Sequence, residues 1–179
     1  MNNSHRIINN IDFVGIGFQR CATSWLNFML YEHPEICKPK SGLHFFNKNY
    51  NKGKTWYIRT ILESCKKGND KIKLGEFSTT YSYPEYHNLV FDRVSRDFPN
   101  IKILINIRNP IGRAQSEYFR LIKRQEIKKI GFRRAIKEKP EIIERGYYAQ
   151  IIQDYINAFG NNNVHITKFE DITNNPLRE

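Results

Sequence analysis

The stretch 12–30 constrains the fold most strongly. Residues 13–17 (Phe-Val-Gly-Ile-Gly) are short and apolar, which is typical of a buried strand. The residues that follow place apolar side chains at helical spacing, and the tight link between the two segments holds Arg20, Thr23 and Ser24. A strand that turns directly into a helix leaves unpaired N–H groups at the positive end of the helix dipole. The pattern therefore predicts an anion site of the kind that phosphate occupies, to which Arg20 adds a positive charge.

Two alternatives bear on this link. One is an ordinary turn in which Thr23 or Ser24 caps the helix, because a single glycine-bearing turn has low specificity. The other is a Walker A loop, but the places for its second glycine and its lysine, counted from Gly17, hold Ala22 and Thr23. The missing lysine argues against a nucleoside-triphosphate kinase or ATPase.

Composition narrows the class of protein. A length of 179 residues fits one domain, residues 1–179, with room for a core. The formal net charge of +11 indicates an anionic partner such as a nucleotide, an acidic glycan, nucleic acid or an anionic membrane, or else a basic solvated surface.

The spacing of the cysteines and histidines indicates neither a set of disulfides nor a metal site. Cys21, Cys37 and Cys65 are an odd, widely spaced set without a CxxC pair, and the five histidines show no HxxxH spacing. We therefore expect no disulfide framework, no structural metal and a reducing, cytoplasmic location. No apolar run resembles a signal peptide or approaches the roughly 20 residues of a membrane helix.

The hydrophobic pattern predicts alternating strands and helices. Residues 1–10 are expected to be frayed, 35–55 to form a long loop with an anchored turn, and 125–145 to form a mobile, solvated segment around a short helix, suited to a substrate lid. The remaining elements are strands at 71–75, 101–107 and 164–169, and helices at 56–65, 85–97, 110–124 and 146–159. This order predicts an α/β fold of three layers, with a mostly parallel, P-loop-like sheet flanked by helices.

A second segment has the same strand-turn-helix organisation as the first. The apolar strand 101–107 leads straight into Arg108, and Pro110 suits the first position of a helix capped by Asn109. Ser116 lies two turns into that helix. A further polar segment, 76–83, is expected to follow the strand at 71–75, where ligands sit in open α/β sheets.

Taken together, these motifs resemble those of the sulfotransferases that use 3′-phosphoadenosine 5′-phosphosulfate (PAPS). Gln19-Arg20-Cys21-Ala22-Thr23-Ser24-Trp25-Leu26 is similar to the family's 5′-phosphosulfate loop, and Arg108-Asn109-Pro110 with Arg113, Ser116 and Tyr118 is similar to its 3′-phosphate motif. The resemblance runs from about residue 12 to 176, nearest to the glycan-modifying and bacterial branches. The C-terminal part is shorter than is usual in the family.

The resemblance implies a reaction and a set of donor contacts. A sulfuryl group passes from PAPS to a hydroxyl or amine, adenosine 3′,5′-bisphosphate leaves, and no metal takes part. Arg20 stands where the family has lysine, and because arginine keeps its proton at neutral pH it is expected to stabilise the leaving group by charge alone. The implied donor-binding residues are Gln19, Arg20, Cys21, Ala22, Thr23, Ser24, Trp25, Arg108, Ser116 and Tyr148. Trp25 and Tyr148 also fit core packing, which is the favoured interpretation for Tyr148.

The general base departs from the glycan-modifying pattern. Those relatives often carry Lys-Glu just before a His-Phe-Phe segment, and Ser41-Gly42 occupies these places here. The candidates that remain are His44 and Glu76, each of which also fits a structural role.

Other departures bear on the acceptor. Ala22 replaces a family glycine, and Phe77 replaces a lysine that glycan-binding relatives carry. The sequence predicts a small-molecule or glycan acceptor and no need for nucleic acid, and lysines between 38 and 54 either indicate an acidic acceptor or form a solvated face. A non-catalytic module that binds nucleotide or polyanion and, less favoured, a P-loop kinase-like phosphotransferase are the competing functions.

Overall fold

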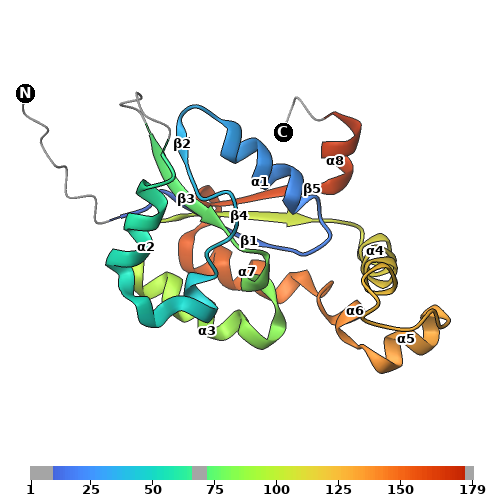
Figure 1. The fold of residues 1–179 in the computed structure, drawn as a ribbon. Coiled ribbons are helices and arrows are strands. Elements are labelled where there is room, and N and C mark those ends of the chain that lie inside the picture. The colour runs from blue at the N-terminus through green and yellow to red at the C-terminus, as the bar shows by residue number, and fades with distance from the viewer. Residues whose placement is uncertain (1–9, 66–71, 176–179) are drawn as a thin grey trace, which may run out of the picture.

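The protein folds around a parallel sheet (Figure 1). The computed structural model describes residues 10–65 and 72–175, and its five strands within these ranges pair only in parallel, in the order β2-β3-β1-β4-β5. The strands are β1 (Phe13–Gly17), β2 (Ile36–Cys37), β3 (Lys73–Phe77), β4 (Lys102–Ile107) and β5 (Val164–Lys168). All five residues of β1 are buried, as a central strand covered on both faces requires. The predicted α/β class with a parallel sheet is confirmed.

Helices cover both faces of the sheet. Figure 1 shows α1 (Thr23–Glu32) and α8 (Phe169–Asn174) on one side, and α2 (Gly53–Leu62), α3 (Pro84–Asp97) and α7 (Tyr148–Phe159) on the other. The helix predicted at 146–159 is α7, and Ile151, Tyr155 and Phe159 form its buried face. Short turns of helix complete these layers: η1 (Phe45–Asn49), η2 (Tyr50–Lys52), η3 (Thr79–Ser82) and η4 (Asn161–Asn163).

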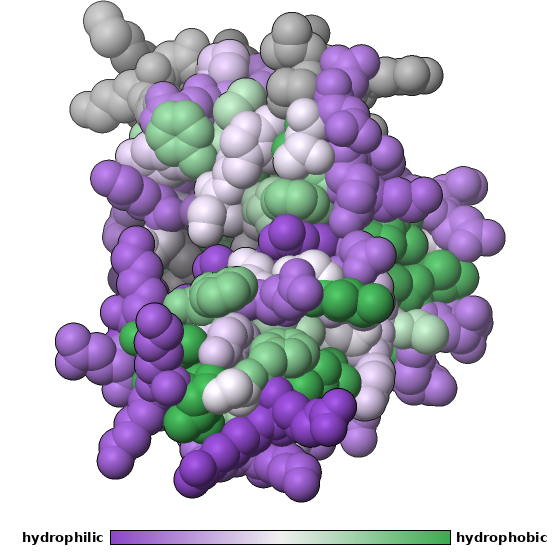
Figure 2. Space-filling view, turned by 90° about the vertical axis from the view of Figure 1, so that its right-hand side faces the viewer, coloured by the Kyte–Doolittle hydropathy of each residue, from purple (hydrophilic) through white to green (hydrophobic). Residues whose placement is uncertain are grey.

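Three helices form a lobe beside the sheet. They are α4 (Pro110–Lys123), α5 (Phe132–Glu138) and α6 (Glu141–Glu144), and their small core comprises Ala114, Leu121, Ile127, Ala135 and Ile142. The short helix predicted within 125–145 is confirmed as α5, and most charged side chains of this segment are exposed, as expected. The segment is nevertheless packed onto a core, which was not predicted, and its role as a substrate lid stays a prediction. The apolar residues of this segment belong to different short elements, so they share no single period. On this side of the molecule, hydrophilic side chains surround separate hydrophobic patches (Figure 2).

Element boundaries differ from prediction at the short elements. The expected loop at 35–55 contains β2, a strand of only two residues, together with η1 and η2. β3 runs to Phe77, so Glu76 lies in a strand and not in the loop after it. α8 begins at Phe169, which was expected to end the last strand. In each case the element is too short for periodicity to reveal it.

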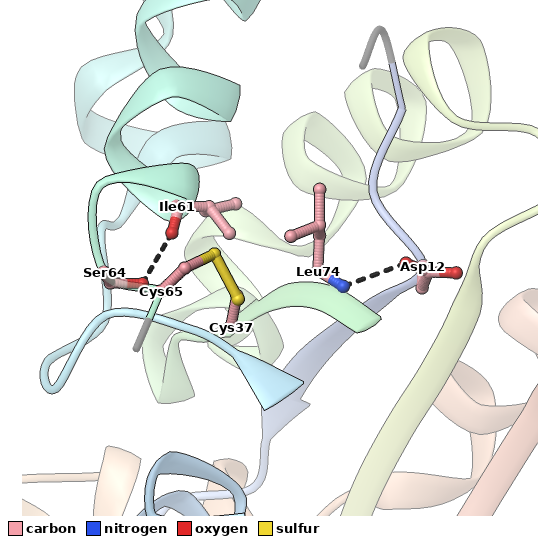
Figure 3. The surroundings of a disulfide bond; sticks show 6 residues. All are labelled: Asp12, Cys37, Ile61, Ser64, Cys65 and Leu74. Atoms are coloured by element: carbon pink, nitrogen blue, oxygen red, sulfur yellow. Dashed lines mark hydrogen bonds between the residues drawn. A yellow bond between two sulfur atoms is a disulfide. The ribbon is translucent and has the colours of Figure 1, made fainter. Parts of the chain in front are cut away.

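A disulfide contradicts the expectation from cysteine spacing. Cys37 on β2 and Cys65 beyond α2 are bonded, with their Cα atoms 4.6 Å apart (Figure 3). Cys21 is free and buried. The partners are distant in sequence and meet because α2 returns the chain to the sheet edge. The expected reducing, cytoplasmic location loses the support it drew from the cysteines and stays a prediction.

Some predictions fall outside the described residues. These are the fraying of residues 1–9 and the first residue of the strand predicted at 71–75. The assignment of 1–179 to one domain stays a prediction. Within 10–65 and 72–175, no helix has the length and apolar character needed to cross a membrane. The same ranges hold no group of three or more His, Cys, Asp or Glu side chains placed to share a metal ion.

Candidate functional site

The two predicted anion motifs lie together at the carboxyl ends of the strands β1 and β4. β1 and β4 are parallel neighbours, so the segments that follow them emerge side by side. The guanidinium of Arg20 donates to Ser116 Oγ from Nε at 3.0 Å and from Nη2 at 2.8 Å. Arg108 Nη1 donates to the backbone oxygen of Arg20 at 3.5 Å. Residues of the two motifs are therefore in direct contact.

The loop before α1 is shaped to receive an anion. Arg20 and Ala22 have positive φ angles of 72° and 58°, and Ala22 is the N-cap of α1 with no side-chain cap hydrogen bond. The alternative in which Thr23 or Ser24 caps this helix is wrong, because Thr23 is already the first helical residue. Successive N–H groups at an uncapped helix start form a concave site for phosphate or sulfate oxygens.

The helix that follows β4 begins differently. Asn109 Oδ1 accepts hydrogen bonds from the backbone N–H of Ile111 at 3.0 Å and of Gly112 at 3.3 Å, and Pro110 is the first helical residue. The predicted Asn109 cap is confirmed. The Asn109 side chain therefore occupies the first N–H groups of α4, whereas the equivalent groups of α1 are left open. An anion at the α4 end of the site can be bound by side chains but not by the start of the helix.

A cleft of about 440 Å³ lies over the two motifs. Seven predicted donor-binding residues line it, namely Gln19, Arg20, Ala22, Thr23, Ser24, Arg108 and Ser116. Thr79, from the polar segment 76–83 where a ligand was expected, also lines the cleft, while sequence reasoning missed Arg120, Arg124 and Phe169. The two arginines continue the helical face of Ser116 at intervals of four residues, and this spacing was a usable signal.

The cleft is rich in arginine, but its charges are not equally free. Arg120 forms ion pairs with the buried Glu117 at 2.8 Å and with Glu126 at 2.8 Å, and these carboxylates raise the pKa of Arg120. The guanidinium of Arg108 stacks on the ring of Phe169 at 4.0 Å and has no carboxylate within ion-pair distance among the described residues. The uncompensated positive charge of the cleft therefore lies mainly at Arg20 and Arg108, with the exposed Arg124 at its edge.

Three predicted donor contacts do not line the cleft. Cys21 is fully buried, with its thiol 3.7 Å from Tyr148 Oη, and burial raises the pKa of the Cys21 thiol to about 11. Tyr148 packs its ring on Phe18, with the ring centroids 4.5 Å apart. Trp25 lies on α1 outside the lining set. Packing contacts therefore account for Cys21 and Tyr148, whereas the role of Trp25 in donor binding stays a prediction.

A second, smaller pocket of about 160 Å³ adjoins the cleft. The two share Thr23, Ser24 and Thr79, and the other lining residues of the pocket are Asn27, Gly42, His44, Phe77 and Ser78. None of the five lysines predicted near an acceptor mouth (Lys38, Lys40, Lys48, Lys52 and Lys54) lines it. Gly42, the position of the absent glutamate, is part of its wall.

His44 lies in this pocket in a fixed orientation. Its backbone N–H donates to Ser78 Oγ at 3.0 Å, and its Nδ1 is 2.8 Å from Thr80 Oγ1. Asn47 Nδ2 donates to the same Thr80 oxygen at 2.9 Å. Burial, and then the nearby charge of Lys48, lower the pKa of His44 below its ordinary value of 6.5. The imidazole is therefore neutral at physiological pH, as a proton acceptor must be.

Glu76 lies outside both cavities. It is fully buried on β3 and accepts hydrogen bonds from the backbone N–H of Leu43 at 2.9 Å, from Ser78 Oγ at 2.8 Å and from the hydroxyl of Tyr81. Burial raises the pKa of Glu76, although these hydrogen bonds oppose the shift. Its contacts fasten the segment that carries His44.

Comparison with known proteins agrees with this geometry. The chain is 24% identical over 177 residues to human heparan sulfate glucosamine 3-O-sulfotransferase 5, a match that covers 92% of this chain and 49% of the relative. It is 26% identical over 140 residues to the membrane-associated sulfotransferase kil1 of Dictyostelium discoideum, covering 74% of this chain and 29% of the relative. The chain thus spans about half the length, or less, of these curated relatives.

A solved structure and a family model extend the comparison. The crystal structure of a sulfotransferase from Alicyclobacillus acidocaldarius superposes with a TM-score of 0.75 at 26% identity, covering 94% of this chain and 77% of that one. The model of the sulfotransferase domain matches residues 10–179, which is nearly the whole sequence. The chain therefore belongs to the sulfotransferase domain family.

Proposed function

We propose that this protein transfers a sulfuryl group from PAPS to a hydroxyl or amine of a small-molecule or glycan acceptor and releases adenosine 3′,5′-bisphosphate. One observation carries the proposal. Arg20 contacts Ser116 and Arg108 across one cleft, so a loop suited to a phosphosulfate and a pair of side chains suited to a phosphate share one wall. Family membership supports the same reaction.

The residues of the cleft fit a donor with anionic groups at both ends of its ribose. The uncapped N–H groups at the start of α1, with Thr23 and Ser24, would hold the 5′ phosphosulfate. Arg108 and Ser116 would hold the 3′ phosphate. The donor supplies an activated sulfur, at which the acceptor oxygen or nitrogen replaces the bisphosphate.

Arg20 stabilises the charge that develops on the leaving group. Its guanidinium is held by Ser116 before any donor binds, so little reorganisation is needed during the reaction. A guanidinium stays protonated at neutral pH and therefore cannot act as a general acid. The contribution of Arg20 is therefore electrostatic.

His44 takes the acceptor proton in this scheme. It is the titratable side chain in the lining of the smaller pocket, which opens beside the cleft at Thr23, Ser24 and Thr79. When Nδ1 carries the proton and donates it to Thr80 Oγ1, the other ring nitrogen is free to accept one. Glu76 positions the 43–44 backbone and is not assigned a chemical step.

Calorimetric titration with adenosine 3′,5′-bisphosphate tests the donor site. Arg108→Ala is expected to weaken binding by roughly 1.5–3 kcal/mol, or about 10- to 150-fold, because it removes a charge-assisted contact. Arg134→Ala is the matched control, since Arg134 is an exposed arginine on α5 paired with Glu138 and outside the cleft. Equal affinities for wild type and Arg108→Ala would remove the proposed 3′-phosphate site.

A further inference from the structure

Three residues with side-chain hydroxyls form the boundary between the cleft and the smaller pocket. Thr23 and Ser24 begin α1, Thr79 begins η3 just after β3, and each of the three lines both cavities. Thr23 and Ser24 belong to the loop that is proposed to hold the 5′ phosphosulfate. Thr79 comes from a different part of the chain and has no role in the scheme above, although a group that passes between the cavities passes beside it.

The hydroxyl of Thr79 is available to a ligand. Thr79 Oγ1 forms no hydrogen bond with any other residue that the structure describes, and it is not one of the buried side-chain atoms without a partner. The oxygen is therefore open to the space that its residue lines. The next residue differs, because Thr80 Oγ1 contacts His44 Nδ1 at 2.8 Å and Asn47 Nδ2 at 2.9 Å. Of the two adjacent threonines, one fixes the proposed base and the other keeps its donor free.

The backbone of Thr79 is held in place beside the end of β1. Ser82 Oγ donates to the backbone oxygen of Thr79 at 3.2 Å. A Cβ atom at Gly17 would lie 3.1 Å from that same oxygen, so η3 packs closely on the last residue of β1. The chain continues from there into the loop that carries Arg20. A donor fixed in this way needs little reorganisation when charge develops next to it.

The smaller pocket offers no cation to the group that is transferred. Lysine, arginine, aspartate and glutamate are absent from its lining. Phe77 stands where glycan-binding relatives carry a lysine, and its ring fills the space that a side chain at Gly15 would need. On this side of the site, negative charge on a sulfuryl oxygen therefore meets neutral donors only. Hydroxyl groups such as that of Thr79 are suited to this task.

We infer, on the basis of the proposed function, that Thr79 is a catalytic residue whose hydroxyl donates a hydrogen bond to an oxygen of the transferring sulfuryl group. The acceptor oxygen bonds to sulfur as its proton passes to His44, and the bond between sulfur and the 5′-phosphate oxygen breaks to release the bisphosphate. The sulfur then lies between the smaller pocket and the cleft, where the shared residues stand. Thr79 donates from the β3 side, and Thr23 and Ser24 from α1.

Titration with PAPS and with adenosine 3′,5′-bisphosphate isolates this contact, because the two ligands differ by the sulfuryl group. Thr79→Val replaces the hydroxyl by a methyl group of similar shape. It should weaken PAPS binding about 3- to 10-fold and leave bisphosphate affinity unchanged, while Thr79→Ser should retain PAPS affinity. Thr60→Val is the matched control, since Thr60 donates to the backbone oxygen of Trp56 at 2.9 Å and lines neither cavity. It should alter neither affinity.

Release of labelled sulfate from PAPS to water measures the transfer step without an added acceptor. The water oxygen bonds to sulfur, its proton passes to His44, and the bisphosphate leaves. At saturating PAPS, Thr79→Val should slow this release about 10²-fold, because one donor to the developing charge is lost. Thr79→Ser should recover most of the rate, and Thr60→Val should match the wild type. Thermal unfolding confirms that each variant folds.

The outcomes separate this inference from the function on which it depends. The inference is wrong if Thr79→Val leaves the rate of sulfate release unchanged, if it weakens PAPS and bisphosphate alike, or if Thr79→Ser is no better than Thr79→Val. If release to water is too slow to measure, the ratio of PAPS to bisphosphate affinity decides alone, and an unchanged ratio overturns the inference. In these cases the donor site stands. Absence of bisphosphate binding by the wild type defeats the proposed function and the inference with it.

Discussion

At the scale of single residues, the site depends on pairs of side chains that are far apart in sequence. Arg20 and Ser116 are separated by 96 positions, and His44 and Thr80 by 36. The residue types in each motif indicated that Arg20, Arg108 and His44 carry chemistry. The resemblance already placed Arg20, Arg108 and Ser116 around one donor, whereas the contact of His44 with Thr80 could not be predicted, because it depends on how the segment 35–55 packs against the residues that follow β3. Cys21 and Tyr148 show the reverse case, in which motif positions are occupied by packing residues.

Because His44 is proposed as the general base, kcat/KM should decrease at acidic pH, forming an acidic limb in the pH profile. A base acts only when it is deprotonated, so kcat/KM should rise with pH through the pKa of His44 and level off above it. Burial and Lys48 lower that pKa, and the limb should therefore lie below pH 6.5, with full activity at neutral pH. A pH profile of sulfate transfer locates it. His44→Asn should lose about 10²- to 10⁴-fold in kcat.

Two further measurements make the His44 prediction specific. Bisphosphate affinity should be unchanged in His44→Asn, because His44 lines the smaller pocket and not the donor cleft. Lys48→Gln should move the acidic limb upward, since it removes a positive charge that disfavours protonation of His44. An acidic limb that persists unaltered in His44→Asn would assign the base to another group.

At the scale of elements, sequence reasoning succeeded where a pattern was long. The strand β4 and the helix α7 were predicted because one hydrophobic pattern extends over many residues, and the start of α4 was predicted from the cap and proline at Asn109-Pro110. β2 and α8 were missed because two and six residues carry almost no periodicity. β3 was ended too early because Glu76 suggests a loop, whereas three hydrogen bonds allow this carboxyl group to be buried within a strand.

The disulfide yields a prediction at this scale. It closes a loop between Cys37 and Cys65 that contains η1, α2 and the segment bearing His44. Joining residues 28 positions apart restricts the unfolded chain, so Cys37→Ser with Cys65→Ser should lower the free energy of unfolding by roughly 3–4 kcal/mol. Denaturant unfolding of the oxidised wild type and the double variant measures the difference.

Thiol counting checks the same bond independently. In denaturant without reductant, one thiol, that of Cys21, should react with a chromogenic reagent, and all three should react after reduction. Cys21→Ser is the control, because it should abolish the single reactive thiol and leave the disulfide in place. Three reactive thiols in the unreduced protein would show that the bond does not form under the conditions of purification.

At the scale of the whole molecule, the basic charge is unevenly distributed. Residues 123–139 contain eight basic and two acidic residues, a net of +6 in a chain whose total is +11. Seven of the eight basic residues are exposed, and they belong to the α4–α6 lobe beside the donor cleft. A surface of this kind attracts polyanions without specific geometry. Such attraction is what the alternative of a polyanion-binding module requires, so it must be separated from recognition of the donor.

Salt dependence separates the two kinds of binding. Heparin, used as a generic polyanion, should bind through the exposed lobe, and its affinity should fall steeply between 50 and 300 mM salt because binding releases counterions. Lys128→Glu with Lys129→Glu should weaken heparin binding and flatten that slope. Bisphosphate affinity, measured at the same salt concentrations, should fall less steeply and should not respond to the double variant, because Lys128 and Lys129 lie outside the cleft.

The cleft variant completes the comparison. Arg108→Ala should have the converse effect, with a large loss of bisphosphate affinity and little change for heparin, because Arg108 is one charge at the wall of a cleft and contributes little to an extended basic surface. Independent responses of this kind favour a catalytic donor site over a polyanion-binding module. If the lobe variant and the cleft variant instead weakened both ligands in parallel, the cleft would be one part of a single electrostatic surface, and the module would be the better account of the protein.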